Sequence, residues 1–174
     1  DWLTADGVVA DAILGHSFGG KVALAFADRA RSEALQVWII DSTPEARQSS
    51  GSAAGMLAII RRLPQRFASR AEGAQALVDE GVEPGVAQWM ATNLARDGGE
   101  MRWALDFDVM QQLLDDFFAT DLWPVIENPA PAHDIHLLKA SESSAMSPAA
   151  VSRIQAVEED HIHLHLRQGG HWIH

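Results

Sequence analysis

The sequence Gly-His-Ser-Phe-Gly-Gly at residues 15–20 lies between two runs of different character. Residues 10–14 before it (Ala-Asp-Ala-Ile-Leu) are mostly apolar, which predicts the end of a buried strand. Residues 21–27 after it (Lys-Val-Ala-Leu-Ala-Phe-Ala) are small and strongly helix-forming. A strand, a tight turn and a helix, with Ser17 at the apex and a glycine two positions to each side, form the pattern of a nucleophile elbow.

The chemistry of such an elbow explains its glycines. Ser17 has to adopt a strained backbone conformation that projects its hydroxyl above the sheet, and Cβ atoms on Gly15 and Gly19 would crowd that turn. The backbone N–H of Phe18 then points at the oxygen that becomes negative during acyl transfer. We therefore predict Ser17 as a nucleophile and the Phe18 N–H as a donor of an oxyanion hole. The structural alternative is a tight strand-to-helix connection without a catalytic role.

Two further candidate side chains follow the serine, first an acid and then a histidine. Residues 38–41 (Trp-Ile-Ile-Asp) close an apolar strand on a carboxylate, and residues 169–174 (Gly-Gly-His-Trp-Ile-His) follow another strand-like run. Side chains at successive strand ends meet at one edge of a parallel sheet, which is how a catalytic triad is assembled in such folds. We predict His171 as general base and acid, in preference to His174, because it directly follows the double glycine.

Residues 15–21 (GHSFGGK), 40–44 (IDSTP) and 170–174 (GHWIH) resemble the α/β-hydrolase esterases of the YbfF type, whose eukaryotic relatives are the mitochondrial abhydrolase-domain proteins. The elbow is common to the superfamily, whereas D-x-x-P and GHWIH are typical of this branch. The resemblance covers nearly the whole chain. It implies the α/β-hydrolase fold, a mostly parallel sheet with helices on both faces and a helical cap.

The chain is short for that fold, with 174 residues. It begins at what we expect to be the tail of the helix before the nucleophile strand, and it stops before the final helix. We therefore expect a partial sequence without the N-terminal strands of the sheet. The loop that supplies the second oxyanion-hole donor is expected among the missing residues.

The expected order of segments is core, helical cap, core. Residues 1–43 carry the elbow and the acid strand, residues 44–131 form the cap, and residues 132–174 return to the core with the catalytic histidine. The cap is predicted as almost wholly helical, with a short extended piece at 100–105. Most of its apolar stripes are expected to be core, and a minority to line an acyl pocket above Ser17. In the core segments we predict strands at 35–40, 134–139 and 161–166 and helices at 21–31 and 148–157, with the 35–40 strand buried on both faces.

Two carboxylates compete for the role of orienting His171. Most of the superfamily places this acid after the strand predicted at 134–139, where Glu142 lies one position from the usual aspartate. In YbfF-type esterases the acid follows the preceding strand, at the position of Asp41. We favour Asp41, because it directly ends a strand and follows the nucleophile by 24 residues, and Glu142 is the alternative. A turn or capping residue is the other interpretation of Asp41, and a solvated loop charge that of Glu142.

His16 is given a supporting role at most, and no catalytic role is assigned to His161, His163 or His165. His16 is expected to pack beneath the elbow. His161, His163 and His165 alternate, so they share one face of a strand. Imidazoles alone can bind zinc, but a polar strand face that meets solvent or a helix is the favoured interpretation. We predict no metal and no organic cofactor.

Composition excludes several kinds of partner. A net charge of −11 argues against nucleic acid and anionic membrane surfaces. The chain has no cysteine, which excludes a thiol nucleophile, disulfides and thiolate metal sites. No apolar run approaches the about 20 residues of a membrane-spanning helix. We expect a cytoplasmic protein with a small-molecule substrate; a targeting segment would lie upstream of this sequence, and the oligomeric state is not predicted.

The predicted function is that of a serine hydrolase for carboxylic esters or thioesters, an esterase that works through an acyl-enzyme. Short to medium acyl chains are implied by the resemblance alone. A carbon–carbon bond hydrolase or a cofactor-free perhydrolase would use the same Ser-His-Asp set. Dehalogenases and most epoxide hydrolases of this fold need an aspartate where Ser17 stands. A non-catalytic binding module or an inactive fragment is the alternative of a different class.

Overall fold

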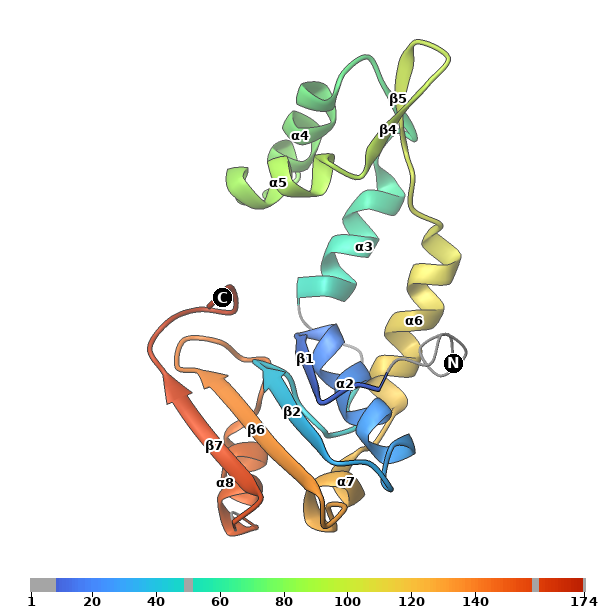
Figure 1. Ribbon diagram of the computed structural model, residues 1–174. Helices are drawn as coiled ribbons and strands as arrows, with labels where there is room; N and C mark the ends of the chain where they lie inside the picture. Colours follow the sequence, from blue (N-terminus) through green and yellow to red (C-terminus); the bar gives the residue numbers. More distant parts are fainter. Residues whose placement is uncertain (1–8, 49–51, 158–159, 174) are drawn as a thin grey trace. The chain divides into compact units, whose positions relative to one another are not determined.

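The computed structural model describes residues 9–48, 52–157 and 160–173. The chain divides into two compact units (Figure 1), residues 1–47 with 119–174 and residues 48–118. Among the helices described, none is long and apolar enough to cross a lipid bilayer.

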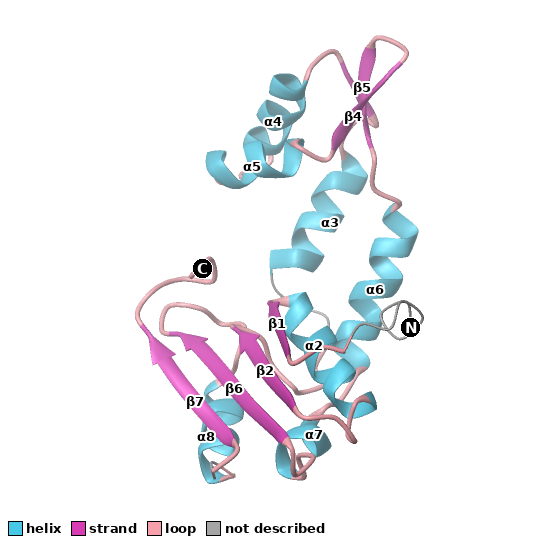
Figure 2. Ribbon diagram, in the orientation of Figure 1, coloured by secondary structure: helices cyan, strands magenta, loops and turns pink. Residues whose placement is uncertain are grey.

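The first unit is built on a four-stranded parallel sheet in the order β1-β2-β6-β7 (Figure 2). Because all pairings are parallel, the carboxyl ends of the four strands lie at the same edge of the sheet. The loops that carry Ser17, Asp41 and His171 all leave from this edge. The strands are β1 Ala12–His16, β2 Leu35–Ile40, β6 His133–Ala140 and β7 Ile162–Arg167.

Three helices of the first unit pack against one face of this sheet: α2 Phe18–Arg29, α7 Trp123–Glu127 and α8 Pro148–Ala156. Their apolar side chains form one buried cluster with the odd-numbered residues of β2 and β6; members from each element are Leu24, Ile39, Ile126, Leu137 and Ile154. The expected second layer of helices on the opposite face is not among the described helices of this unit. That face carries the even-numbered residues of β2 and β6.

Two expectations about burial are wrong. β1 is one of the two edge strands of the described sheet rather than a buried strand, and its Leu14 is 63% exposed. β2 is buried on one face only, because Gln36 is exposed and Trp38 is half-buried. Successive strand residues point to opposite faces, and in both strands the even-numbered ones point away from the helices of this unit.

The second unit combines helices with a small antiparallel sheet in the order β3-β5-β4. Its buried cluster includes Phe67, Leu77, Leu94 and Trp103. The helices are α3 Ser52–Arg62, α4 Arg70–Asp79, α5 Pro84–Ala91 and α6 Phe107–Ala119, and the strands are β3 Arg66–Phe67, β4 Leu94–Asp97 and β5 Glu100–Trp103.

The sheet of the second unit departs from the almost wholly helical prediction. β5 lies within the extended piece expected at 100–105, but β3 and β4 were assigned to helices. β3 has two residues and β4 has four, which is too short for the alternation of polar and apolar residues to stand out from the surrounding sequence. Residues 119–131, grouped with the cap in the sequence analysis, contribute α7 to the core of the first unit. The role of the second unit as a cap is still a prediction.

Ser69 caps the amino end of α4. Its Oγ accepts a hydrogen bond from the Glu72 N–H at 3.1 Å, and the Glu72 carboxylate accepts one from the Ala68 N–H at 2.7 Å. Ser69→Ala removes the first of these acceptors, so we expect the free energy of unfolding in urea to fall by about 1 kcal/mol. Ser69→Asp, which keeps an acceptor, should retain most of the stability. An equal loss in both variants would contradict this account.

Candidate active site

Ser17 occupies the turn between β1 and α2 in a backbone conformation that is rare for a residue with a side chain. Its φ is 55° and its ψ is −118°. The turn is held on both sides: the Ser17 N–H donates to the Ile40 carbonyl at 2.9 Å, and the Ser17 carbonyl accepts from the Gly20 N–H at 3.0 Å. Such a conformation costs on the order of 1–3 kcal/mol and is typical of functional sites.

Two of the glycines around Ser17, Gly15 and Gly20, are required for different steric reasons. A Cβ on Gly15 would lie 1.9 Å from the Gly19 carbonyl oxygen, so the turn closes only over a glycine there. A Cβ on Gly20 would lie 2.6 Å from the Ser42 Cβ, so this glycine lets α2 approach the loop after β2. A Cβ on Gly19 would meet nothing within 4 Å. The prediction that a Cβ would crowd the turn is therefore confirmed for Gly15 and wrong for Gly19.

The structure brings the side chains of Ser17, His171 and Asp41 together in one chain of hydrogen bonds. His171 Nε2 lies 2.9 Å from Ser17 Oγ, and His171 Nδ1 lies 2.6 Å from Asp41 Oδ2. The Asp41 side chain is fully buried, whereas that of His171 is 28% exposed. A nucleophile, a base within hydrogen-bond reach and a third group that orients the base are the parts that nucleophilic catalysis needs.

Asp41 is held in place by the backbone of β6. Its N–H donates to the Leu138 carbonyl at 2.8 Å, and its Oδ1 accepts from the Ala140 N–H at 3.1 Å. With Oδ2 facing His171, both carboxylate oxygens have partners. Its φ of 45° is positive, as at Ser17. The sequence could not predict that the Ala140 N–H binds the Asp41 carboxylate, because every residue except proline has a backbone N–H.

The structure does not bring Glu142 to His171. Glu142 is exposed in the loop after β6, where its backbone N–H donates to the Gly169 carbonyl at 2.9 Å. Among the described residues, no hydrogen bond joins its carboxylate to His171. His174, the predicted competitor of His171, lies outside the described residues.

His16 contacts the loop that carries His171. Its Nε2 lies 2.7 Å from the His171 carbonyl oxygen, and the two rings are 4.7 Å apart between centroids. Because a carbonyl oxygen only accepts, His16 Nε2 carries the hydrogen. His16 therefore ties the amino side of the elbow to the histidine loop. The Phe18 N–H lies at the amino end of α2, where the amides of the first turn point outward along the helix axis.

The comparison with known families agrees with this arrangement of strand ends. A family model described as the alpha/beta hydrolase family matches residues 2–174. The chain belongs to the alpha/beta hydrolase family. The fold class and the superfamily expected from the sequence motifs are thereby confirmed.

Two curated relatives carry the name sn-1-specific diacylglycerol lipase ABHD11. The mouse protein is 25% identical over 175 residues, which cover 97% of this chain and 55% of the relative. The Xenopus tropicalis protein is 23% identical over 170 residues, which cover 93% of this chain and 51% of the relative. The chain thus spans about half the length of the curated relatives that it matches.

Solved structures show the same fold. A marine microorganism esterase superposes with a TM-score of 0.79 at 20% identity, over 99% of this chain and 67% of that one. E-2-(acetamidomethylene)succinate hydrolase superposes with a TM-score of 0.75 at 16% identity, over 99% of this chain and 63% of that one. At these identities the likeness establishes the fold alone.

Proposed function

We propose that this protein cleaves carboxylic esters or thioesters, with Ser17 as nucleophile, His171 as general base and acid, and Asp41 as the orienting acid. The observation that carries the proposal is the continuous chain from Ser17 Oγ through His171 to Asp41, with separations of 2.9 and 2.6 Å. The curated relatives named lipase support an ester as the substrate class.

The direction of the hydrogen bonds follows from the Asp41 carboxylate, which can only accept. His171 therefore donates its Nδ1–H to Asp41 and presents the lone pair of Nε2 to the Ser17 hydroxyl, which donates to it. In this tautomer His171 is ready to take the serine proton. Asp41 is fully buried, so its charge is poorly screened by water where the imidazolium forms.

Acyl transfer then proceeds in two steps. Ser17 Oγ attacks the acyl carbon, its proton passes to His171 Nε2, and the carbonyl electron pair moves onto the oxygen, which accepts from the Phe18 N–H. The intermediate collapses when His171 returns the proton to the leaving alcohol or thiol, which leaves the acyl group on Ser17. Water, deprotonated by His171, attacks this acyl-enzyme, and the acid and the free serine are released.

A fluorophosphonate probe tests the proposal, because it phosphonylates only an activated serine. Peptide mapping by mass spectrometry should find the adduct on Ser17, and heat-denatured protein should carry none. Hydrolysis of p-nitrophenyl acetate, butyrate and octanoate, of an acyl thioester and of a diacylglycerol then defines the acyl group and the leaving group. The proposal is contradicted if the protein has the circular dichroism of a folded α/β protein but is not labelled, or is labelled at another serine. Either result would favour a binding module.

A further inference from the structure

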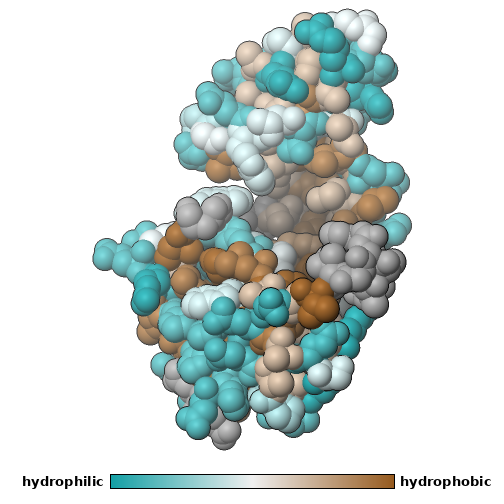
Figure 3. Space-filling model, in the orientation of Figure 1, coloured by the Kyte–Doolittle hydropathy of each residue, from teal (hydrophilic) through white to brown (hydrophobic). Residues whose placement is uncertain are grey.

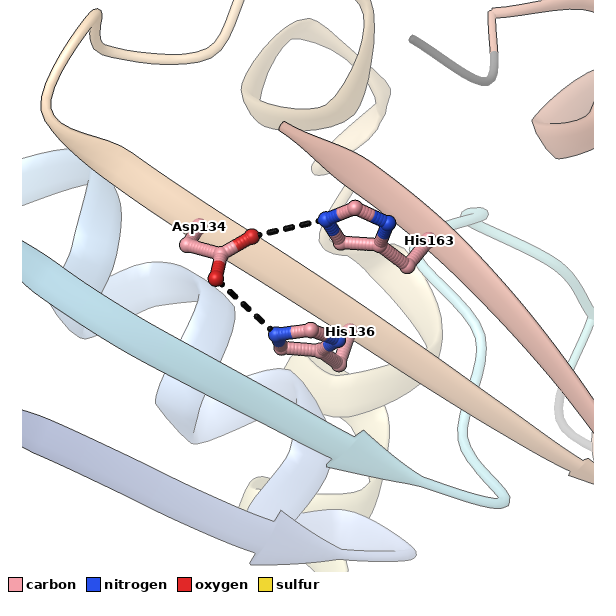
Figure 4. Close-up of side chains that lie close together, drawn as sticks. All are labelled: Asp134, His136 and His163. Atoms are coloured by element: carbon pink, nitrogen blue, oxygen red, sulfur yellow. Dashed lines mark hydrogen bonds and ion pairs between the residues drawn. The ribbon is translucent and has the colours of Figure 1, made fainter. Parts of the chain in front are cut away.

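A second group of functional side chains lies on the opposite sheet face from α2, α7 and α8. Asp134 and His136 come from β6 and His163 from β7, and His136 pairs with His163 in the register of the two strands. Figure 4 shows the three side chains turned toward one another above the strands. In Figure 3, hydrophilic residues predominate over the lower part of the first unit.

The ligand atoms of this group converge. Asp134 Oδ1 lies 2.8 Å from His163 Nε2, and Asp134 Oδ2 lies 3.1 Å from His136 Nε2. One ligand atom from each residue can be chosen so that all three lie within 4.8 Å of one another. Zinc binds nitrogen and oxygen at about 2.0–2.2 Å in a tetrahedron, which separates its ligand atoms by about 3.3–3.6 Å. The contacts at 2.8 and 3.1 Å would have to lengthen by a few tenths of an ångström, and ligand atoms up to 4.8 Å apart would have to approach by roughly 1 Å, to reach that geometry.

His136 is oriented by neighbours on both sides. Its Nδ1 lies 3.1 Å from His165 Nε2, and Trp38 stacks on its ring at 4.1 Å with an interplanar angle of 11°. In the present contacts the His136 Nε2–H donates to the Asp134 carboxylate; when a metal ion takes the place of this hydrogen, Nδ1 carries the hydrogen and donates to His165. A metal-binding histidine whose other nitrogen is hydrogen-bonded is the usual arrangement.

The group is charged and accessible. Partial burial by itself raises the pKa of Asp134, but the hydrogen bonds from His136 and His163 outweigh it, so the pKa lies below its ordinary value. The exposed fractions of the Asp134, His163 and His136 side chains are 44%, 36% and 13%. The carboxylate is therefore an anion at neutral pH, open on its outer side to a solvent ligand.

We propose that Asp134, His136 and His163 bind one divalent transition-metal ion, with zinc as the probe. Two imidazoles and one carboxylate are a common zinc ligand set, and water completes the tetrahedron. This proposal differs from the expectation of no metal that was drawn from the sequence. Of the three alternating histidines only His163 is a ligand, and the other two ligands, Asp134 and His136, come from the neighbouring strand β6. It shares no residue with the chain from Ser17 to Asp41. Its ligands join β6 to β7, so the bound metal stabilises the folded protein.

The test begins with protein freed of metal by a chelator. Calorimetric titration with zinc should give one equivalent bound at this site, and cobalt(II) should give the visible absorption bands of a tetrahedral complex. Asp134→Asn and His163→Gln should each weaken zinc binding by at least about 10-fold, and His165→Ala, which removes the partner of His136, by about 10-fold. Zinc should raise the Tm of the unmodified chain and leave that of His163→Gln unchanged.

Two control variants separate this site from other histidines. His161→Ala removes an exposed histidine beside the same strand, and His171→Ala removes the base of the proposed triad; both should bind zinc as the unmodified chain does. Circular dichroism establishes that each variant is folded, and Asp134→Asn, nearly identical in shape, remains informative if a histidine variant unfolds. The proposal is overturned if zinc does not bind, if binding survives both Asp134→Asn and His163→Gln, or if it disappears only in His171→Ala.

Discussion

Ser17→Ala is expected to lower the kcat of p-nitrophenyl butyrate hydrolysis by at least about 10⁴-fold, because in the proposed mechanism the acyl-enzyme forms on the Ser17 hydroxyl. The hydroxyl is the partner of His171 Nε2 at 2.9 Å, and alanine leaves that base with nothing to deprotonate next to the acyl carbon. The measurement is steady-state kinetics, with active-site titration of the unmodified chain to count functional serines.

Alanine at position 17 has to adopt the same positive φ, which costs free energy, so the folding of the variant is measured together with its activity. Ser17→Cys is the matched control, because it keeps a nucleophile of similar size and should be acylated by a reactive ester. Retention of more than a tenth of the activity by Ser17→Ala, in a preparation free of other esterases, would remove Ser17 from the role of nucleophile.

Asp41→Asn is expected to lower kcat by about 10⁴-fold while the fold is kept. The carbonyl oxygen of the new amide can still accept from the Ala140 N–H, which turns the amide NH₂ toward His171 Nδ1. That NH₂ only donates, so His171 must accept at Nδ1 and carry its hydrogen on Nε2, which faces Ser17. The histidine is then in the wrong tautomer to take the serine proton. Hydrolysis of p-nitrophenyl butyrate across pH measures the effect.

Glu142→Gln is the matched control for that variant. The carboxylate of Glu142 is exposed, so its conversion to an amide should change kcat by less than about twofold, within the range of ordinary surface substitutions. Loss of activity with Glu142→Gln and not with Asp41→Asn would move the orienting acid to the loop after β6. It would also remove the argument, based on Asp41, that this chain resembles the YbfF-type esterases.

The sequence by itself determined the features that depend on neighbours along the chain. The strand, turn and helix around Ser17 were readable because an apolar run, a glycine turn and an alanine-rich run are local signals. Strand ends at Asp41 and before His171 could be predicted to meet, since parallel strands end at one edge of a sheet. β2 has the bounds predicted from the same local patterns, and α8 begins at the predicted residue and ends one residue earlier than predicted.

Only the tertiary structure decided features that depend on side-chain direction and strand register. Asp41 and His171 are 130 positions apart, and which of two candidate carboxylates reaches the imidazole is set by the packing of β2 against β6. The close approach at Gly20, the amide of Ala140 and the convergence of Asp134 with His163 arise in the same way. Spacing along a chain reports which face of a strand a residue occupies, whereas contacts between strands depend on the register that the packed core imposes.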